Sequence, residues 1–117
     1  MFNEMAKIIH TDNVIAGWWT DPETGEYLER NKGELLALIH SEISECLEGV
    51  RKGIPDDKLP HRSMEEVEMA DAIIRILDYA GRFGLDLDGA IAEKRAYNQK
   101  RADHKPENRR QPGGKKF

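Results

Sequence analysis

The chain of 117 residues has one cysteine, Cys46, and no long apolar stretch. A single cysteine excludes an internal disulfide and a cluster of thiolates that holds zinc or an iron–sulfur centre. No segment approaches the roughly 18 consecutive apolar residues of a membrane span, and the opening residues MFNEMAKIIH lack the apolar core and cleavage site of a signal peptide. These absences predict a soluble, cytoplasmic protein with no membrane partner.

The chain is also short, and its charge is uneven. Its length and its 38% content of hydrophobic residues suit one compact domain and exclude a large multidomain enzyme. The net charge of the chain is −4. Residues 103–117 hold five basic and two acidic side chains, a charge of +3, so residues 1–102 carry −7. An acidic body of this kind disfavours nucleic acid as a partner. Hard cations, or a phosphate ligand accompanied by them, suit it better.

Helix signals divide the chain into four helical segments, at about residues 3–16, 32–51, 63–80 and 86–102. The starts of the last three are marked by capping residues: Asn31 with Glu34, Ser63 with Glu66, and Asp86 or Asp88. Glycine, proline and a turn signal at residues 17–25 predict a loop or short hairpin after the first helix. The predicted fold is all-α, a four-helix bundle without a sheet, with a helical domain at 1–104 and an irregular basic tail at 105–117.

Two carboxylates of the predicted helix 32–51 face the same side as its apolar residues. At about 100° per residue, Glu42 lies inside the apolar arc that contains Leu35, Ile39 and Cys46. Glu45 lies at the edge of this arc. Two acidic side chains therefore point inward from one helix.

The predicted helix 63–80 has the opposite proportions. Apolar side chains cover about half of its circumference, more than the ~100° stripe of a surface helix, so we expect it to be buried on several sides. Its narrow polar stripe consists of Glu68, Asp71, Arg75 and Asp78. Burial of several like charges is costly unless a positive group neutralises them, and a bound cation is the simplest solution.

The inward carboxylates of the two helices predict an all-oxygen site suited to Mg²⁺ or Mn²⁺. The predicted ligands are Glu42, Glu45, Glu68 and Asp71. In the alternative interpretation, Glu42 and Glu68 pair with lysine or arginine side chains at the rim of an ordinary helical core, and the pattern alone leaves both open. A di-iron site is disfavoured because neither His40 nor His61 follows a candidate glutamate by three residues.

One face of the predicted helix 86–102 changes from apolar to polar halfway along. After its apolar first half, the face continues as Lys94, Asn98 and Arg101. Lysine and arginine bind phosphate oxygens, and Asn98 offers hydrogen bonds to a base or sugar, so this face predicts an anion site. The alternative is a solvated helix end with favourable cations near its C-terminus.

The adjacent Trp18 and Trp19 are too large to be left exposed without a reason. At least one is expected to be buried or to stack on a base, and core packing is the commoner role for such a residue. Both are candidate substrate-binding residues.

The acidic motifs have a recognisable order. Glu42-Ile-Ser-Glu45, 22 intervening residues and Glu68-Met-Ala-Asp71 resemble the ExxE and ExxD motifs of the MazG-like, all-α nucleoside triphosphate pyrophosphohydrolases. The later Lys94, Asn98 and Arg101 resemble the Lys-x-x-x-Asn-x-x-Arg segment of that superfamily. The similarity extends from about residue 35 to 101, and the ending Gly-Gly-Lys-Lys-Phe is similar to the tail of small, stand-alone, phage-type members.

This resemblance implies hydrolysis of a nucleoside triphosphate to the monophosphate and pyrophosphate, with Mg²⁺ held by the four carboxylates. It also implies a homodimer or homotetramer of helical bundles. A P-loop NTPase is excluded because the chain has no GxxxxGK[ST] loop. Two other classes stay open: a non-catalytic helical interaction module, and a nucleotide sensor that binds without turnover. The preferred base and sugar are not indicated by the sequence.

Overall fold

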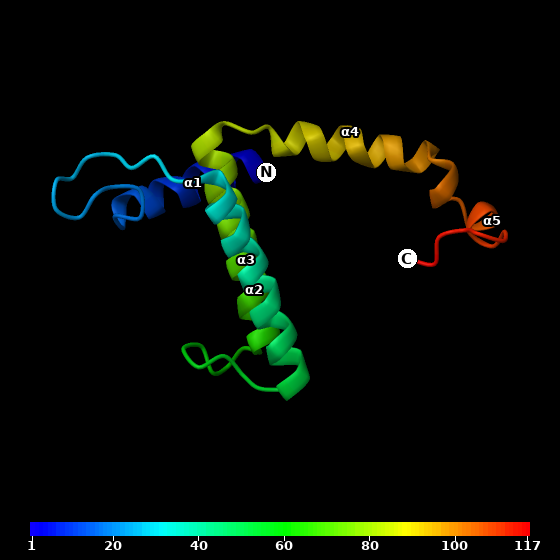
Figure 1. The fold of residues 1–117 in the computed structure, drawn as a ribbon, viewed down its shortest axis with the longest axis horizontal. Coiled ribbons are helices and arrows are strands. Elements are labelled where there is room, and N and C mark those ends of the chain that lie inside the picture. The colour runs from blue at the N-terminus through cyan, green and yellow to red at the C-terminus, as the bar shows by residue number, and fades with distance from the viewer. The chain divides into compact units, whose positions relative to one another are not determined.

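The computed structural model describes residues 1–117 and contains helices and no strand. The elements are α1 (Phe2–Ile15), α2 (Lys32–Lys52), α3 (Met64–Phe83), α4 (Leu87–Lys100), the 3₁₀ turn η1 (Ala102–His104) and the short α5 (Pro106–Arg109) (Figure 1). The predicted all-α class is therefore confirmed. The chain divides into two compact units, Met1–Leu85 and Asp86–Phe117. None of the helices is both long enough and apolar enough to cross a membrane.

Helix α3 begins and ends at the signals that its sequence carries. The Ser63 side chain accepts a hydrogen bond from the Glu66 backbone N–H, and the Glu66 side chain accepts one from the Ser63 backbone N–H. This reciprocal capping satisfies two donors that the first turn leaves free. Gly84 ends the helix at φ 63°, a left-handed conformation that glycine adopts without a Cβ clash.

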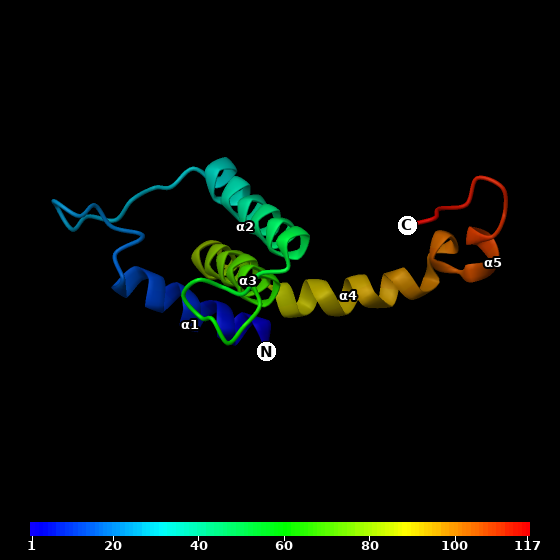
Figure 2. The same cartoon turned by 90° about the horizontal axis from the view of Figure 1, so that it is seen from below.

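In the first unit, α3 contacts both α1 and α2. Helices α2 and α3 run antiparallel and lie side by side in Figure 1 and Figure 2, while α1 contacts α3 from another side. The buried apolar side chains come from all three helices and the loop between α1 and α2: Ala6, Trp19, Leu35, Cys46, Ala72, Leu77 and Ala80. The core of this unit therefore lies along α3.

Gly81 permits the close approach of α1 to α3. A Cβ atom built at Gly81 would lie 2.5 Å from the Ala6 carbonyl oxygen and 2.8 Å from the His10 Cβ. Both distances are shorter than real Cβ contacts, and the carbonyl oxygen belongs to a helix backbone that moves only as a whole. The missing side chain at Gly81 thus sets how near the two helices come.

The loop of residues 16–31 is attached to the core through Trp19, of which 1% is exposed. The Trp19 indole N–H lies 3.1 and 3.2 Å from the two carboxylate oxygens of Asp78 on α3. Farther along, Thr20 and Tyr27 form an isolated antiparallel bridge that closes the predicted short hairpin. The expectation that at least one of the two tryptophans is buried is confirmed for Trp19.

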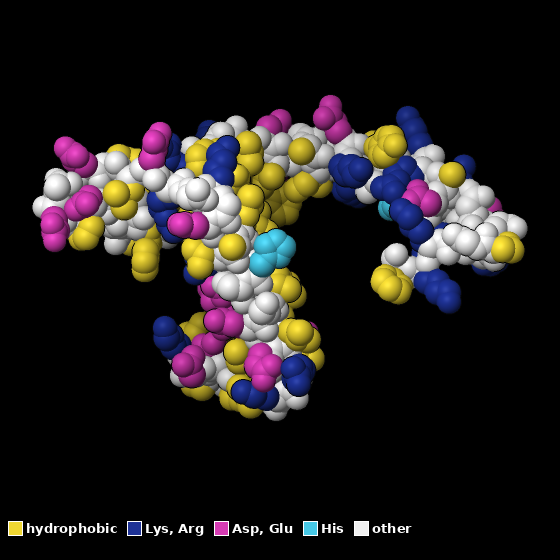
Figure 3. Space-filling view, viewed as in Figure 1, with side chains coloured by type: hydrophobic (Ala, Val, Ile, Leu, Met, Phe, Trp, Pro, Cys, Tyr) yellow, Lys and Arg dark blue, Asp and Glu magenta, His cyan; other side chains and the backbone are white.

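Many apolar side chains of α2 and α3 stay exposed in the single chain, and Figure 3 shows one such face. Met69, Ile73 and Ile76 of α3 are 45, 47 and 40% exposed, and Ile43 and Leu47 of α2 are 47 and 60% exposed. The expected burial of α3 on several sides is therefore incomplete within one chain, because its two helical neighbours cover only part of its apolar half.

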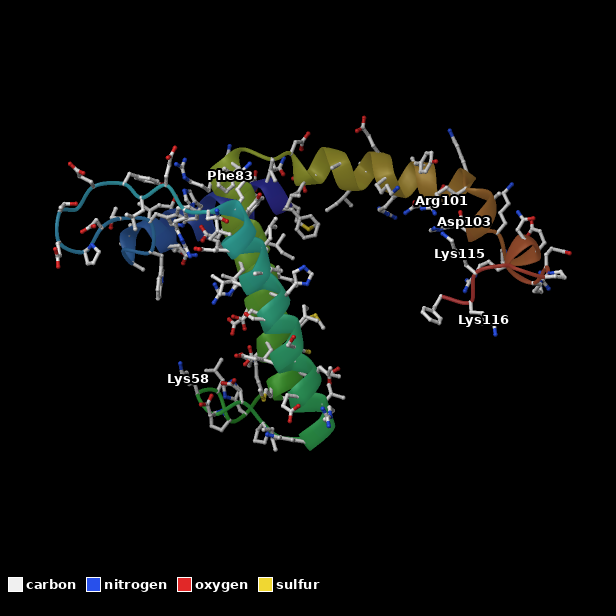
Figure 4. The ribbon with its side chains drawn as sticks, in the orientation of Figure 1. Lys58, Phe83, Arg101, Asp103, Lys115 and Lys116 are labelled. Carbon is white, nitrogen blue, oxygen red and sulfur yellow. The ribbon has the colours of Figure 1, made fainter.

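The second unit is held together by polar contacts. The Asp86 side chain caps α4 by accepting from the Gly89 N–H, and α4 buries none of its residues. Arg101 donates two hydrogen bonds to Asp103, of 2.6 and 3.0 Å, and Lys115 Nζ lies 3.0 Å from the same carboxylate. Figure 4 shows these three side chains converging.

The region predicted as an irregular tail contains ordered turns. Pro106 occupies the start of α5, where its missing N–H costs nothing, and the Asn108 side chain donates to the Ala102 carbonyl at 2.7 Å. Arg109 donates to the carbonyls of Lys115 and Lys116. Side-chain hydrogen bonds to the backbone thus fold this segment where the Pro and Gly content predicts no regular structure.

Candidate metal centre

Three of the four predicted ligands come together between α2 and α3. Glu42 of α2 and Glu68 and Asp71 of α3 each offer one carboxylate oxygen, and these oxygens all lie within 4.8 Å of one another. The antiparallel pairing of the helices brings the two acidic segments side by side. We call this group the carboxylate triad. Oxygen donors at this spacing suit a hard divalent cation, and the triad could hold one.

Glu68 is the least satisfied member of the triad. Glu42 and Glu68 are each 8% exposed. The Glu68 Oε2 atom is buried without any hydrogen-bond partner, and Glu68 forms no ion pair. A buried acceptor without a partner is costly, and a cation at the triad would supply what this oxygen lacks.

The triad is electrostatically strained in the absence of a cation. Burial, followed by the neighbouring Glu42 and Glu45 carboxylates, raises the pKa of Glu68 to about 8. The pKa of Asp71 is also raised, by burial first and then by the charge of Glu42, while Arg75 acts in the opposite direction. Like charges held at short range favour the protonated form, which is the electrostatic condition that a divalent cation relieves.

Arg75 is the only cation that pairs with the triad. Its Nε donates to Glu42 Oε1 at 2.8 Å, from a side chain that is 40% exposed. The alternative interpretation of the sequence, in which the acidic residues pair with basic ones, therefore holds for Glu42. It does not hold for Glu68, which lacks such a partner.

Glu45, the fourth predicted ligand, is exposed and lies outside the triad. It still lines the same cavity and contributes to the raised pKa of Glu68. Its position follows from its place at the edge of the inward face of α2. The loop opposite adds the buried Asp56, whose Oδ2 accepts from the backbone N–H groups of Lys58 and Leu59.

Two cavities meet at the triad. A cavity of about 880 Å³ is lined by all four predicted ligands and by the loop between α2 and α3. A second cavity, of about 620 Å³, is lined by three cations, Arg30, Lys58 and Arg75, and by three carboxylates, Glu42, Asp71 and Asp78. We call it the cationic cavity. Glu42, Lys58 and Asp71 belong to both walls, so a ligand of the triad has room on either side.

The two tryptophans differ in position. Trp18 is 66% exposed and lines the cationic cavity, whereas Trp19 is buried and donates to Asp78. His10 Nδ1 lies 2.8 Å from the same Asp78 carboxylate, and the Tyr27 hydroxyl lies 3.3 Å from His10 Nε2. Trp18 is thus placed for contact with a ligand, while Trp19 anchors the loop that carries it.

Lys94, Asn98 and Arg101 lie in the second unit. Lys94 Nζ lies 4.9 Å from the centre of the Tyr97 ring, and Arg101 is bound to Asp103. The hydrogen bonds to Asp103 raise the pKa of Arg101. The role of these three residues in substrate binding stays a prediction.

The sequence pattern gives no role to several residues around the triad. Arg75 and Asp78 belong to the polar stripe of α3, where a spacing of four and seven residues after Asp71 places them on the same face. Their partners, 33 and 59 residues away in the sequence, leave no local signal. Arg30 and Lys58 come from loops, for which helical spacing predicts nothing.

Comparisons of the chain with protein-family models, with curated proteins and with solved structures find no match.

Proposed function

We propose that the protein is a metal-dependent pyrophosphohydrolase of the MazG-like type, which converts a nucleoside triphosphate and water to the nucleoside monophosphate and pyrophosphate. The observation that carries the proposal is the triad with the unpaired, buried Glu68 oxygen, situated where two cavities meet. The order of the ExxE and ExxD motifs in the sequence points the same way.

In this proposal, residues of the first unit bind the cation and the base of the substrate. Glu42, Glu68 and Asp71 bind the cation, Mg²⁺ or Mn²⁺, and the exposed Glu45 joins them from the rim of the cavity. The cation supplies charge neutralisation for the phosphates and lowers the pKa of an attacking water. No side chain of the chain is needed as a nucleophile. Trp18, exposed at the wall of the cationic cavity, offers a face for stacking of the base.

The proposal includes a homo-oligomer, a dimer or a tetramer, built from four-helix bundles. Its support is the exposed apolar surface of α2 and α3, including Leu47 at 60% and Ile73 at 47% exposure. A second copy would remove such surface from water, and two-fold assembly is the commonest symmetry of soluble oligomers. Lys94, Asn98 and Arg101 also bind substrate in this proposal, as the family resemblance implies.

The test is a screen of the purified protein with Mg²⁺ against the common and damaged nucleoside and deoxynucleoside triphosphates, with detection of pyrophosphate. We expect pyrophosphate and monophosphate in equal amounts from at least one substrate, and none after chelation of the metal. Binding of metal and nucleotide without turnover would identify a nucleotide sensor instead. Absence of both would leave a helical interaction module.

A further inference from the structure

The Arg75 side chain contacts Glu42 of the triad and also borders the cationic cavity. The contact with Glu42 is made by its Nε. The two terminal nitrogens of its guanidinium make no hydrogen bond within the chain. Arg75 therefore uses one of its donors and leaves the planar fork, the part that matches phosphate oxygens, free at a 40% exposed side chain.

A cation at the triad competes with Arg75 for Glu42. The Glu42 oxygen that faces Arg75 belongs to a carboxylate of the triad, and a divalent ion there would repel a guanidinium held 2.8 Å from that carboxylate. The unpaired Glu68 oxygen indicates independently that the triad accepts a ligand. Cation binding thus weakens the ion pair that now holds Arg75.

The cationic cavity offers a second anion for Arg75. Arg30 and Lys58 line it without forming any ion pair, and the Arg30 guanidinium is positioned over the Trp19 ring at 5.1 Å from its centroid. Of the three carboxylates in this wall, Glu42 and Asp71 would face the cation, and Asp78 is already bonded to His10 and Trp19. The three cations then fit a ligand with several negative charges, and a chain of phosphates is the ligand that also brings oxygens to the metal.

We propose that Arg75 exchanges partners, pairing with Glu42 in the metal-free protein and with a polyphosphate in the cationic cavity when a divalent cation takes Glu42. Metal and polyphosphate then bind cooperatively. The metal takes Glu42 and leaves the Arg75 guanidinium without a partner, and the polyphosphate pairs with that guanidinium. The identity of the polyphosphate as the tail of a nucleoside triphosphate rests on the proposed function. The coupling itself rests on Arg75, Glu42 and the two cavities.

The first test measures binding of Mg²⁺ alone by calorimetry, using the full chain without nucleotide. In Arg75→Gln, the competing cation is removed, and we expect Mg²⁺ to bind about tenfold more tightly. The matched control is Arg62→Gln, which removes an exposed ion pair with Glu66 at the start of the same helix, outside both cavities. This control should bind Mg²⁺ as the wild type does. Unchanged or weaker binding in Arg75→Gln overturns the proposal.

The second test measures inorganic tripolyphosphate at a Mg²⁺ concentration that saturates both the protein and the anion. The expected effect on affinity is opposite to that in the first test: Arg75→Gln should bind tripolyphosphate about tenfold more weakly than the wild type. A purely structural ion pair would lower the melting temperature of the variant without opposite effects on the two ligands. Equal tripolyphosphate affinity in the two proteins contradicts the exchange.

The third test follows an NMR signal of Arg75 in the wild-type protein. The ¹⁵Nε–H NMR signal of Arg75, assigned by its absence in Arg75→Lys, should shift when Mg²⁺ is added to the wild type. A signal that stays in place while Mg²⁺ binds overturns the proposal even if Arg75→Gln does not fold.

These readouts separate the inference from the proposed function. Opposite changes in Mg²⁺ and tripolyphosphate affinity, without hydrolysis of any nucleotide, support the exchange and refute the enzyme. Hydrolysis with unchanged affinities in Arg75→Gln supports the enzyme and refutes the exchange.

Discussion

The two units of the chain are stabilised by different kinds of interaction. Residues 1–85 carry nine basic and 17 acidic side chains, hence −8, whereas residues 86–117 carry nine basic and five acidic, hence +4. Helix α3 buries five residues, two of them carboxylates, and α4 buries none. The first unit therefore has a core in which charge is costly, and the second depends on caps and surface ion pairs. Only the first unit buries a carboxylate oxygen without a partner, that of Glu68, and it is this oxygen that points to a ligand.

The largest expected effect comes from removing a charge of the triad. Asp71→Asn keeps the shape of the side chain and deletes one anionic ligand. We expect Mg²⁺-dependent pyrophosphate release to fall about 100-fold, the scale for loss of one preorganised electrostatic stabiliser. The variant should stay folded, because relief of like-charge repulsion offsets the change. The control is Glu65→Gln on the exposed side of α3, and wild-type turnover by Asp71→Asn would refute the metal assignment.

Helix contact in the first unit is broken by a methyl group. Gly81→Ala places a Cβ against the Ala6 carbonyl, and we expect a loss of about 3 kcal/mol in the free energy of unfolding, the upper range for overpacking. The matched change in the second unit is Ala96→Gly at an exposed site in α4, for which about 1 kcal/mol is expected from helix propensity. Denaturant unfolding followed by circular dichroism compares the two. A smaller loss for Gly81→Ala than for Ala96→Gly would contradict the contrast between the units.

The stability of the metal-free protein should depend on pH through Glu68. Its pKa is about 8 in the fold against a reference of 4.5, so between these values the folded state binds more protons than the unfolded state. The contribution of Glu68 to stability is therefore fully present below pH 4.5 and is lost as the pH rises toward 8. The expected loss is of the order of 2 kcal/mol between pH 5 and pH 7.

Denaturant midpoints in EDTA at several pH values measure this loss. Glu68→Gln should flatten the profile, and saturating Mg²⁺ should reverse it because the ionised carboxylates bind the cation. An identical pH profile in wild type and Glu68→Gln would show that Glu68 does not titrate as expected.

The smallest effect is expected in the second unit. Asp103→Asn removes the carboxylate whose pKa is lowered by the hydrogen bond from Arg101 first and that from Lys115 second. Since this pair lies at the surface, the melting temperature should move by no more than about one degree. The order of residues 109–117, read from heteronuclear NMR relaxation, should nevertheless decrease. Unchanged relaxation would show that Arg109 and its backbone hydrogen bonds suffice to hold the segment.

The sequence predicts the helices well because their signals are local. The capping pair Ser63 and Glu66 lies three residues apart, and Gly53 and Gly84 follow the last turns of α2 and α3. The inward position of Glu42, Glu68 and Asp71 follows from helical spacing relative to the apolar residues, and the structure places these three together. Spacing also puts Glu45 at the edge, where it is found exposed.

The parts that could not be predicted involve partners far apart in the chain. The Glu42–Arg75 pair joins two helices, and its formation depends on side-chain reach rather than on the pattern of either helix. The Trp19–Asp78 hydrogen bond requires the path of the loop, which composition does not define. For α4, spacing identifies a polar face with Lys94, Asn98 and Arg101, but a face alone does not specify what it contacts.

The anchoring of Trp19 has a consequence for the loop in which it lies. Residues 16–31 connect α1 to α2. Burial of Trp19 against Asp78 fixes this segment three residues after Ala16, the C-cap residue of α1. The Thr20–Tyr27 bridge and the hydrogen bond from the Leu28 N–H to the Trp19 carbonyl join the two ends of the hairpin, so only residues 29–31 remain between this anchored part and α2. A shorter connection loses less configurational entropy on closure. Trp18, directly before Trp19, and Arg30, two residues before α2, both line the cationic cavity, so the anchored loop presents both side chains to it. This side of the cavity is therefore held in place by contacts within the loop and with α3, rather than by contact with a ligand.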